Sequence, residues 1–525
     1  MASRITRNLI DLVTGTFVSR VLGFLRELVT AAYYGTNRAM DLFVIAFTIP
    51  TFFRHFLGED VVERAFLPPF KKLISQTRYQ QAWRLLSACF NWMVLVLIIL
   101  TGLLYLIAPV VVKIIAPGLE PAIFPKAINM TYWILPFMLI IGLAAFVGSI
   151  LNFFELNKIY SLAPAMLSIG VIIGVHFFRR WLGIYALPAG FLLGGLLELL
   201  IQVPFLWKRE IRQQTSARYH PALDLREQEM RTIGRESGFI LLKSLLDKSV
   251  EIVDRMLASF LITGSIASLW YAQRLIQLPV AIIGLSISRA LVPYLTEKKA
   301  LVQDRDFLAG IRLGITLNLS MVMPTVVLMV VMAQPIIGLV YQRGHFDGES
   351  TRLTAIAFWC YSLGLIGISL DTFFSRLFSI FQKNKIPFKI AMFTAALNVV
   401  LNLILVKTPL KHGGIALASS IAFSVGCVLL FYFLSREIEH QIRFREILSD
   451  FLKIGFNCLL MGIGVYLLYH HWLQRFLANR VHSFFLQQCY GLIVVGTLAL
   501  ILYLGLIFIL GPEATRRRLF RRSTR

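Results

Sequence analysis

The chain has 525 residues, of which 57% are hydrophobic and only 15% are charged. About a quarter of the residues in a soluble globular domain are charged, so this composition excludes that class of protein. The net charge of +24 would suggest nucleic acid as the partner of a soluble domain. Here the cations lie between apolar stretches, so we expect no nucleic-acid partner.

Apolar stretches recur along almost the whole chain. A run of about 20 apolar residues can cross a bilayer as one helix. Fourteen such stretches are found: 9–35, 40–58, 86–114, 128–153, 160–178, 183–207, 237–262, 266–294, 309–341, 353–381, 387–406, 413–435, 450–471 and 484–510. They predict an all-α integral membrane protein with about 14 transmembrane helices, of which the charged stretches 40–58 and 237–262 are the least apolar.

Lysine and arginine gather in alternate connections between these stretches. The cation-rich connections hold Lys71 and Lys72, the segment 208–235, Lys298 and Lys299, Lys383 and Lys385, and the tail from Arg516. The positive-inside rule places these connections, and with them both termini, in the cytoplasm. Arg179 and Arg180 lie on the opposite side. Because the first stretch exceeds the length of a signal peptide, we expect no cleavable signal. The predicted location is a membrane with one face toward the cytoplasm.

The sequence contains an internal repeat. Residues 157–159 (NKI) recur as 384–386, and Pro50 corresponds to Pro279, with a nearly constant offset. The repeat predicts two six-helix bundles, 1–207 and 236–437, joined by the basic cytoplasmic linker 208–235. Since each half has an even number of helices, a pseudo-two-fold axis along the membrane normal should relate them. Residues 438–525 add helices 13 and 14, nearly free of buried charge and packed outside, and a basic tail.

Charged residues lie inside the first hairpin of the first half. They are Arg20, Arg26 and Glu27 in the first stretch and Asp41, Arg54, His55 and Glu59 in the second. A charge at the membrane centre costs about 3 kcal/mol or more, so we expect these residues to face a watery cavity. Three alternatives stay open. Arg26 and Glu27 could form a structural ion pair, Arg54, His55 and Glu59 could extend to the interface, and Asp41 could favour a helix N-terminus.

The equivalent hairpin of the second half carries a second group of charges. Lys243, Asp247, Glu251 and Arg255 are spaced by four residues, so they share one helix face and can neutralise one another. As a weaker alternative, Asp247 or Asp254 could bind Na⁺ with Thr394 and Asn398 as hydroxyl and amide partners. Arg274 has no acidic residue within four positions and is therefore the best candidate for an unpaired arginine facing substrate.

The arginines indicate an anionic substrate. Guanidinium groups are always charged and bind phosphate in a planar fork, so Arg20, Arg26, Arg54 and Arg274 together could hold a diphosphate. No HExxH, GxSxG or P-loop motif is present, and we expect neither an enzyme nor a cofactor. The five cysteines stand singly in apolar stretches and are expected to be packing residues. A coupling ion or the membrane potential would have to supply the energy.

Several segments resemble the lipid II flippases of the MurJ (MviN) type, in the MOP flippase superfamily. They are Ser19–Arg26 (SRVLGFLR), Asp41–Pro50 (DLFVIAFTIP), Ala65–Pro68 (AFLP), Tyr341–Gly344 (YQRG), Asn384–Pro387 (NKIP) and Asn398–Leu403 (NVVLNL). The resemblance implies transport of an undecaprenyl diphosphate bearing a disaccharide pentapeptide, the peptidoglycan precursor, from the inner to the outer leaflet.

The resemblance also implies roles for individual residues. The four arginines named above match positions that are required in the family or line its cavity, and Asp41 and Glu59 match implicated acids. It further implies that helices 13 and 14 form a groove for the lipid tail. The chain departs from the family at Glu27, His55, Asp60 and Gln273, which changes the charge balance of the site more than the class of substrate.

We weighed three functions. The first is a flippase working by alternating access, with Glu27, Asp41, His55, Glu59, Asp247, Glu251 and Arg255 as cavity or gating residues and membrane lipids around it. The second is a drug or cation antiporter, or another polysaccharide-lipid flippase, of the same superfamily; an antiporter for cations should favour carboxylates over arginines. The third is a membrane enzyme acting on the same lipid, for which the connections are too short and too poor in catalytic residues.

Overall fold

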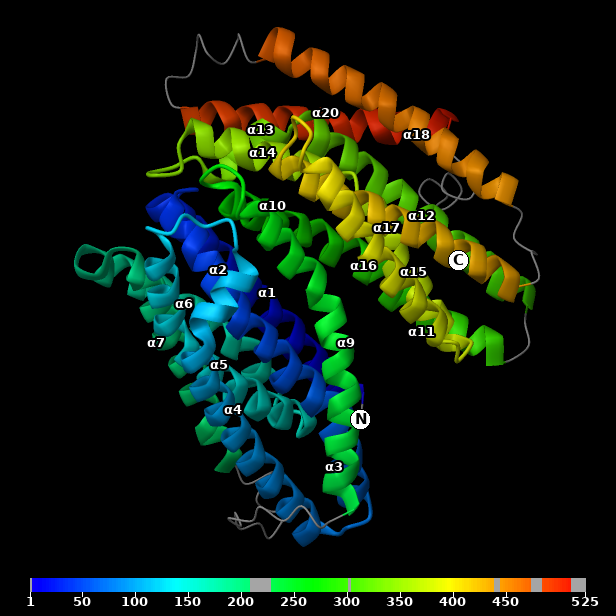
Figure 1. Ribbon diagram of the computed structural model, residues 1–525. Helices are drawn as coiled ribbons and strands as arrows, with labels where there is room; N and C mark the ends of the chain where they lie inside the picture. Colours follow the sequence, from blue (N-terminus) through cyan, green and yellow to red (C-terminus); the bar gives the residue numbers. More distant parts are fainter. Residues whose placement is uncertain (1, 208–227, 301–303, 439–443, 474–483, 511–525) are drawn as a thin grey trace. The chain divides into compact units, whose positions relative to one another are not determined.

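The protein is helical throughout the part of the chain that the computed structural model describes (Figure 1). That part comprises residues 2–207, 228–300, 304–438, 444–473 and 484–510, and it contains no β-strand. The helices form two compact units, Met1–Ala267 and Ser268–Arg525. The predicted all-α class is therefore confirmed. The predicted division into 1–207, 236–437 and 438–525 stays a prediction, and helix α9 (Gln228–Ala258) belongs to the first of these units.

The first unit holds the following elements in chain order: α1 (Ala2–Tyr34), α2 (Arg38–Phe53), η1 (Arg54–Phe66), α3 (Leu67–Ser75), α4 (Tyr79–Ile115), α5 (Phe124–Phe153), α6 (Asn157–Leu182), η2 (Gly183–Tyr185), α7 (Ala186–Gln202), η3 (Val203–Trp207), α9, and the first turn of α10 (Ser265–Pro279). Helix α2 starts where the side chain of Asn37 accepts a hydrogen bond from the Met40 amide at 3.0 Å. Such a cap satisfies a backbone donor that the first helical turn leaves open.

Glycines set the closest helix packing of the first unit. Helices α6 and α7 lie against each other along much of their length, as Figure 1 shows. A Cβ added to Gly170 would lie 2.2 Å from Cα of Gly194, and one added to Gly174 would lie 2.4 Å from Cα of Gly190. The pairing order shows that the two helices are antiparallel. Small residues four apart let membrane helices approach closely in this way.

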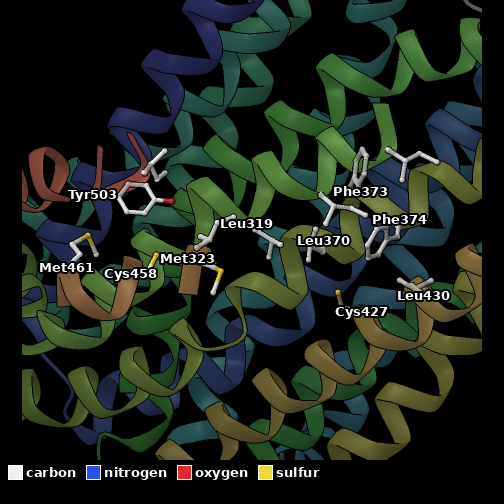
Figure 2. Packing of buried hydrophobic residues seen from close by; sticks show 14 of the residues in the cluster. Leu319, Met323, Leu370, Phe373, Phe374, Cys427, Leu430, Cys458, Met461 and Tyr503 are labelled. Carbon is white, nitrogen blue, oxygen red and sulfur yellow. The ribbon is translucent and has the colours of Figure 1, made fainter. Parts of the chain in front are cut away.

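The second unit continues from α10 with η4 (Val280–Gly284), α11 (Leu285–Ala300), α12 (Asp304–Val331), α13 (Ala333–Tyr341), α14 (Gly348–Ser362), α15 (Leu365–Ile380), α16 (Lys385–Leu405), α17 (His412–Glu437), α18 (Phe444–Leu467), η5 (Leu468–Leu473) and α20 (Phe484–Leu510). One hydrophobic core runs through it. Figure 2 shows Leu319 and Met323 of α12 near Cys458 and Met461 of α18, with Tyr503 of α20 beside them. The last two helices therefore share the core of the unit.

Helix α18 carries one buried charged residue among those that the structure describes. Asp450 is buried, accepts a hydrogen bond from Thr316 Oγ1 at 3.2 Å and lies 3.7 Å from the Arg312 guanidinium. Glu446, one turn earlier, pairs with the same arginine. Asp450 stands at the start of the apolar stretch 450–471, where an acid looks like an end residue. Its acceptor role on α12 is visible only in three dimensions.

All fourteen predicted stretches fall largely within helices. By length and hydropathy, nine helical segments in the described residues could cross a membrane, or ten if the bent pair α14–α15 is one span. One of the nine, Asn157–Leu206, contains both α6 and α7. The chain is therefore a multi-pass membrane protein, whereas the count of fourteen stays a prediction. Helices α1, α2 and α9, which carry the predicted internal charges, are outside this set.

A widened helix follows each of the two matched prolines. After Pro50, α2 continues as the π-helical segment η1, where the Leu67 amide bonds the Val62 carbonyl five residues back. After Pro279, α10 continues as the π-helical segment η4. Proline removes a backbone donor and crowds the preceding turn, so the change of winding has a local cause. The widening after Pro50 begins at Arg54.

Candidate functional site

Arg26 is a half-buried arginine held by two contacts. Its Nη2 donates to Glu27 Oε1 at 2.8 Å, and the two side chains are only 15% and 10% exposed. Its guanidinium carbon lies 5.4 Å from the centre of the Phe191 ring of α7. The ion pair that the sequence offered as a structural alternative is therefore present. It leaves Nε of Arg26 buried and without a hydrogen-bond partner in the described structure.

The Phe191 ring belongs to an aromatic cluster from three helices. Its centre lies 4.5 Å from that of Phe47 and 5.6 Å from that of Phe43, both on α2, and 5.5 Å from that of Phe137 on α5. All four rings are buried. Buried aromatic side chains at these separations pack in offset or edge-to-face geometry and hold one another firmly. The guanidinium of Arg26 thus rests on a rigid, apolar surface.

Two other candidate arginines belong to the first unit. Arg20 is exposed on α1, and Arg54 is half-buried at the point where α2 becomes η1. Since an arginine that binds substrate must be accessible, the exposure of Arg20 is compatible with its predicted role. The side chains of His55, Glu59 and Asp247 lie outside the described residues, so their assignments stay predictions.

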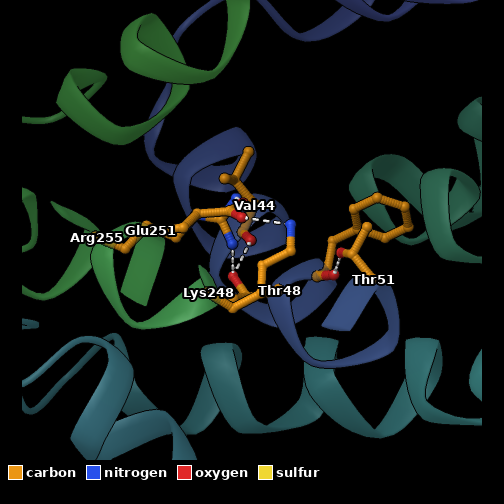
Figure 3. Close-up of polar contacts among 7 residues, drawn as sticks. Val44, Thr48, Thr51, Lys248, Glu251 and Arg255 are labelled. Carbon is orange, nitrogen blue, oxygen red and sulfur yellow. Dashed lines mark hydrogen bonds and ion pairs between the residues drawn. The ribbon is translucent and has the colours of Figure 1, made fainter. Parts of the chain in front are cut away.

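A group of polar contacts joins α2 to α9 (Figure 3). Arg255, which is buried, pairs with Glu251 one turn earlier on its own helix and donates to Thr48 Oγ1 of α2. Lys248 Nζ lies 2.9 Å from the second oxygen of Glu251. The predicted self-neutralisation of this face is confirmed for Glu251 and Arg255. The bond to Thr48 also fastens the ion-pair group to the neighbouring helix.

Asp60 of η1 provides a second link to α9. Its carboxylate accepts a hydrogen bond from Ser244 Oγ of α9 at 3.2 Å and lies 3.1 Å from Arg64 on its own element. Asp60 is one of the positions where the chain departs from the family pattern. The departure therefore adds an acceptor that α9 uses.

Asp41 provides the third link. It is 2% exposed, and its two oxygens accept hydrogen bonds from the backbone amides of Gly264 at 2.7 Å and Ala267 at 2.8 Å. A carboxylate at this place satisfies the open amides of a helix N-terminus and favours its positive dipole end. Asp41 lies in the first turn of α2, near a helix start as predicted. Its carboxylate also caps the N-terminus of another helix, α10.

The three links occur in antiparallel order. Going along α2 and η1 from Asp41 through Thr48 to Asp60, the partners on the other side run backwards from Gly264 through Arg255 to Ser244. Helix α9 is thus bonded to η1 at Ser244 and to α2 at Arg255, and the segment that follows it is bonded to α2 at Gly264. A gating role for Asp41, Glu251 and Arg255 would act through this interface, which the local spacing of charges could not reveal.

Arg274 lies in α10, in the second unit. It is half-buried, and its guanidinium carbon lies 4.0 Å from the centre of the Trp270 ring one turn earlier. The absence of an acid on its own helix, noted in the sequence, holds, but an aromatic face supports the cation. Guanidinium groups stack on aromatic rings while their edges stay available for hydrogen bonds.

The weak Na⁺ candidates include one strongly engaged residue. Asn398 is buried, donates to Ser419 Oγ at 3.1 Å and accepts from Asn402 Nδ2 at 2.9 Å, while the hydroxyl of Thr394 donates to the Ala391 carbonyl. Asp254 is half-buried on α9. In the described ranges, no group of three or more His, Cys, Asp or Glu residues is placed to hold a metal. The Na⁺ assignment stays a prediction.

Two buried residues of the first unit were not singled out in the sequence. Thr48 gave no signal, because a threonine in an apolar helix is common. Glu198, 4% exposed, is the lone charged residue of α7, and Gln202 follows it one turn later at 2% exposed. A single acid in a long apolar stretch was a readable signal by the same argument that selected Asp41.

The family model for the lipid II flippase MurJ matches residues 30–487. The chain belongs to the MurJ lipid II flippase family. A probable lipid II flippase MurJ from Buchnera aphidicola subsp. Acyrthosiphon pisum is 29% identical over 426 residues, covering 80% of this chain and 82% of the relative. One from Rickettsia prowazekii is 26% identical and covers 94% of each chain.

Solved structures agree with this membership at the level of the fold. A lipid II flippase MurJ in an inward closed conformation superposes with a TM-score of 0.77 at 23% identity, covering 98% of this chain and 100% of the other. An inward-facing multidrug resistance MATE transporter of the MOP superfamily superposes with a TM-score of 0.64 at 15% identity, covering 82% and 98%. The MurJ family is one of transporters, not of catalytic enzymes, and its fold is shared with the MATE transporters.

Proposed function

We propose that the protein carries the lipid-linked peptidoglycan precursor, an undecaprenyl diphosphate bearing a disaccharide pentapeptide, from the inner to the outer leaflet of the bacterial plasma membrane. Membership of the MurJ family supports this function, since the similar proteins from Buchnera and Rickettsia bear that name. The arrangement around Arg26 adds support from the chain's own residues. No part of the proposal requires a cofactor.

The observation that carries the proposal is the unsatisfied donor of Arg26. Its guanidinium keeps its positive charge, one edge is bonded to Glu27, and Nε–H is buried with no acceptor in the described structure. A buried donor without a partner costs about 1–3 kcal/mol, and more when it is charged. A phosphate oxygen is the acceptor that such a group binds best. The diphosphate of the precursor would supply it.

The remaining assignments complete the proposed mechanism. Arg20, Arg54 and Arg274 would bind the same diphosphate during the transport cycle. Glu27, Asp41, His55, Glu59, Asp247, Glu251 and Arg255 would line the cavity or act in gating. Arg255 bonds α9 to α2, and Asp41 bonds α2 to the start of α10; these bonds support a gating role, because breaking them would free α9 and the start of α10 from α2.

Energy and orientation also belong to the proposal. The membrane potential, or Na⁺ bound by Asp247 or Asp254 with Thr394 and Asn398, would drive transport. A cationic group that moves through the membrane field gains about 2.3 kcal/mol per charge for each 100 mV. The cation-rich connections would face the cytoplasm together with both termini. This protein would then bind the precursor from the inner leaflet.

A cation or drug antiporter is the rival function, and it is not favoured. The MATE transporter shares the fold at 15% identity, which supports the architecture alone. Among the charged residues described in α1, Arg20 is exposed and Glu27 is buried, and the half-buried charged residue at the start of η1 is Arg54. Cationic substrates would be repelled there.

Replacement of Arg26 tests the proposal. Arg26→Ala and Arg26→Lys should both abolish growth of a strain that depends on this protein, because lysine supplies a point charge in place of the fork. Translocation of fluorescent lipid II by purified protein in vesicles should fall at least tenfold. Arg352→Ala is the control, since Arg352 pairs with Glu349 on an exposed turn and such pairs contribute about 1 kcal/mol or less. Normal translocation by Arg26→Ala would refute the assignment.

A further inference from the structure

We propose that Phe191 of α7 is a positioning residue for Arg26, so that the aromatic ring sets the orientation in which the guanidinium receives the diphosphate. The inference rests on the proposed function of Arg26. It starts from the contact between the guanidinium carbon and the Phe191 ring, at 5.4 Å from the ring centre. This distance is within the range of about 6 Å over which the ring attracts a cation.

Two contacts restrict Arg26 in different ways. Glu27 accepts from Nη2 at 2.8 Å, which fixes one edge of the guanidinium. Phe191 lies against the cation as a buried ring, 5% exposed. Glu27 is the next residue on the same helix. Its bond alone therefore cannot stop the Arg26 and Glu27 side chains from moving together relative to the other helices. Phe191 belongs to another helix and provides the fixed reference.

The ring itself is held in place. Phe47, Phe43 and Phe137 surround it with centre-to-centre distances of 4.5, 5.6 and 5.5 Å. A side chain packed among three other rings has few rotamers available, and its position is settled before substrate binds. Affinity is gained when a binding group is ordered in advance, because less conformational entropy is lost on binding.

Loss of the ring should therefore weaken binding without removing the charge. In Phe191→Leu, Arg26 would keep its pair with Glu27 but lose the ring against which its guanidinium rests. A cation–π contact that is partly desolvated is worth enough to change affinity by about five- to tenfold. Phe191→Tyr keeps a ring face at the same place and should retain most of the affinity.

Phe137 offers a matched control. It is 1% exposed, belongs to the same cluster and packs against Phe191, but the described structure gives it no contact with Arg26. Phe137→Leu removes the same atoms as Phe191→Leu from the same core. Both variants should lose a similar amount of thermal stability. Only Phe191→Leu should lose affinity for the substrate.

The experiment measures binding to the full chain in nanodiscs, with undecaprenyl diphosphate as the probe and undecaprenyl monophosphate for comparison. We expect Phe191→Leu to bind the diphosphate about five- to tenfold more weakly, and Phe137→Leu to stay within about twofold of the unchanged protein. In an Arg26→Ala background, Phe191→Leu should have no further effect, because the group that it positions is gone.

The outcomes separate this inference from the function on which it rests. If Arg26→Ala weakens binding but Phe191→Leu behaves like Phe137→Leu, the positioning role is refuted and the function of Arg26 stands. If Phe191→Leu weakens binding equally with and without Arg26, its effect is structural and the inference is again refuted. If Arg26→Ala leaves the affinity unchanged, both proposals fail.

Discussion

Thr48 is a small residue that holds a buried cation. It is 6% exposed, its hydroxyl accepts from Arg255 of α9, and it donates to the Val44 carbonyl at 3.0 Å. Thr48→Val keeps the shape of the side chain but removes the acceptor. A buried charged donor that loses its partner costs about 1–3 kcal/mol. We expect a lower melting temperature in detergent, measured by intrinsic fluorescence, and easier separation of α9 from α2.

Thr51 supplies the control for this prediction. Thr51 lies three residues after Thr48 on the same helix. Its hydroxyl also donates to the carbonyl four residues back, that of Phe47. It makes no described contact with Arg255, as Figure 3 shows. Thr51→Val should therefore leave the melting temperature nearly unchanged. Equal losses for the two valine variants would mean that the bond to Arg255 contributes nothing.

The sequence could predict polar contacts only where they are local. Glu251 and Arg255 are four residues apart on one helix, so their spacing predicts an ion pair. Arg26 and Glu27 are adjacent in the chain and of opposite charge, which offered a pair as one alternative. Phe191 beneath Arg26, Thr48 beneath Arg255 and the amides that Asp41 caps lie on other helices. No periodicity in a single sequence encodes such partners. The charged residues of the candidate site were predictable, but what holds them was not.

Glycine spacing explains why α6 and α7 pack closely. A Cβ on Gly170 would lie 2.2 Å from Cα of Gly194, too close for any side-chain adjustment to relieve, because the opposing atoms are backbone. Gly170→Ala should push the helices apart and cost about 1–3 kcal/mol, as overpacking commonly does. The loss would appear as a lower melting temperature and a smaller yield of folded protein in membranes.

Gly102 of α4 is the matched control, since a Cβ there meets nothing within 4 Å. Gly102→Ala should be neutral or slightly stabilising, because alanine favours helix more than glycine does. A loss of stability as large as that of Gly170→Ala would show that glycine flexibility, and not close packing, matters in these helices.

Helices were easier to predict than their ends. Apolar stretches of 20 residues or more leave little choice, since every backbone group in a bilayer must be paired within the chain. Two of these stretches are nevertheless interrupted by a break in the helix. The stretch 353–381 is split into α14 and α15, which are bent by 42°. The stretch 309–341 is split into α12 and α13 near Met332. Pro335 lies in the first turn of α13 and Gly364 lies directly before α15, but Pro324 lies inside the unbroken helix α12, so these residue types alone do not predict a break.

Appended helices need not be peripheral. Helices α18 and α20 lie beyond the predicted repeat, yet Asp450 bonds Thr316 of α12, and Tyr503 Oη donates to the Ser320 carbonyl of the same helix. Together with the shared core in Figure 2, these bonds make the pair an integral part of the second unit. A groove for a lipid tail formed by α18 and α20, which the family resemblance implies, would then be a rigid one.

Two residues face the same side of the membrane when the number of crossings between them is even, and opposite sides when it is odd. Between Glu120, which precedes α5, and Asp347, which precedes α14, the chain contains α5, α6, α7, α9, the α10–α11 pair, α12 and α13, of which α13 has only 9 residues and is too short to cross by itself. If α9 crosses the membrane, the number of crossings is even and the two residues face the same side. If α9 does not cross, they face opposite sides. Helix α9 is long enough, with 31 residues, but its charges exclude it from the apolar set.

We expect α9 to cross, because its polar face is bonded to α2 and η1 through Ser244 and Arg255 and so need not meet lipid. In a cysteine-free background, Glu120→Cys and Asp347→Cys should both react with a membrane-impermeant thiol reagent added from outside. Glu155→Cys and Lys383→Cys, in the connections that follow α5 and α15, should react only after the membrane is opened. Opposite accessibility of positions 120 and 347 would show that α9 does not cross, and fourteen crossings would then be excluded.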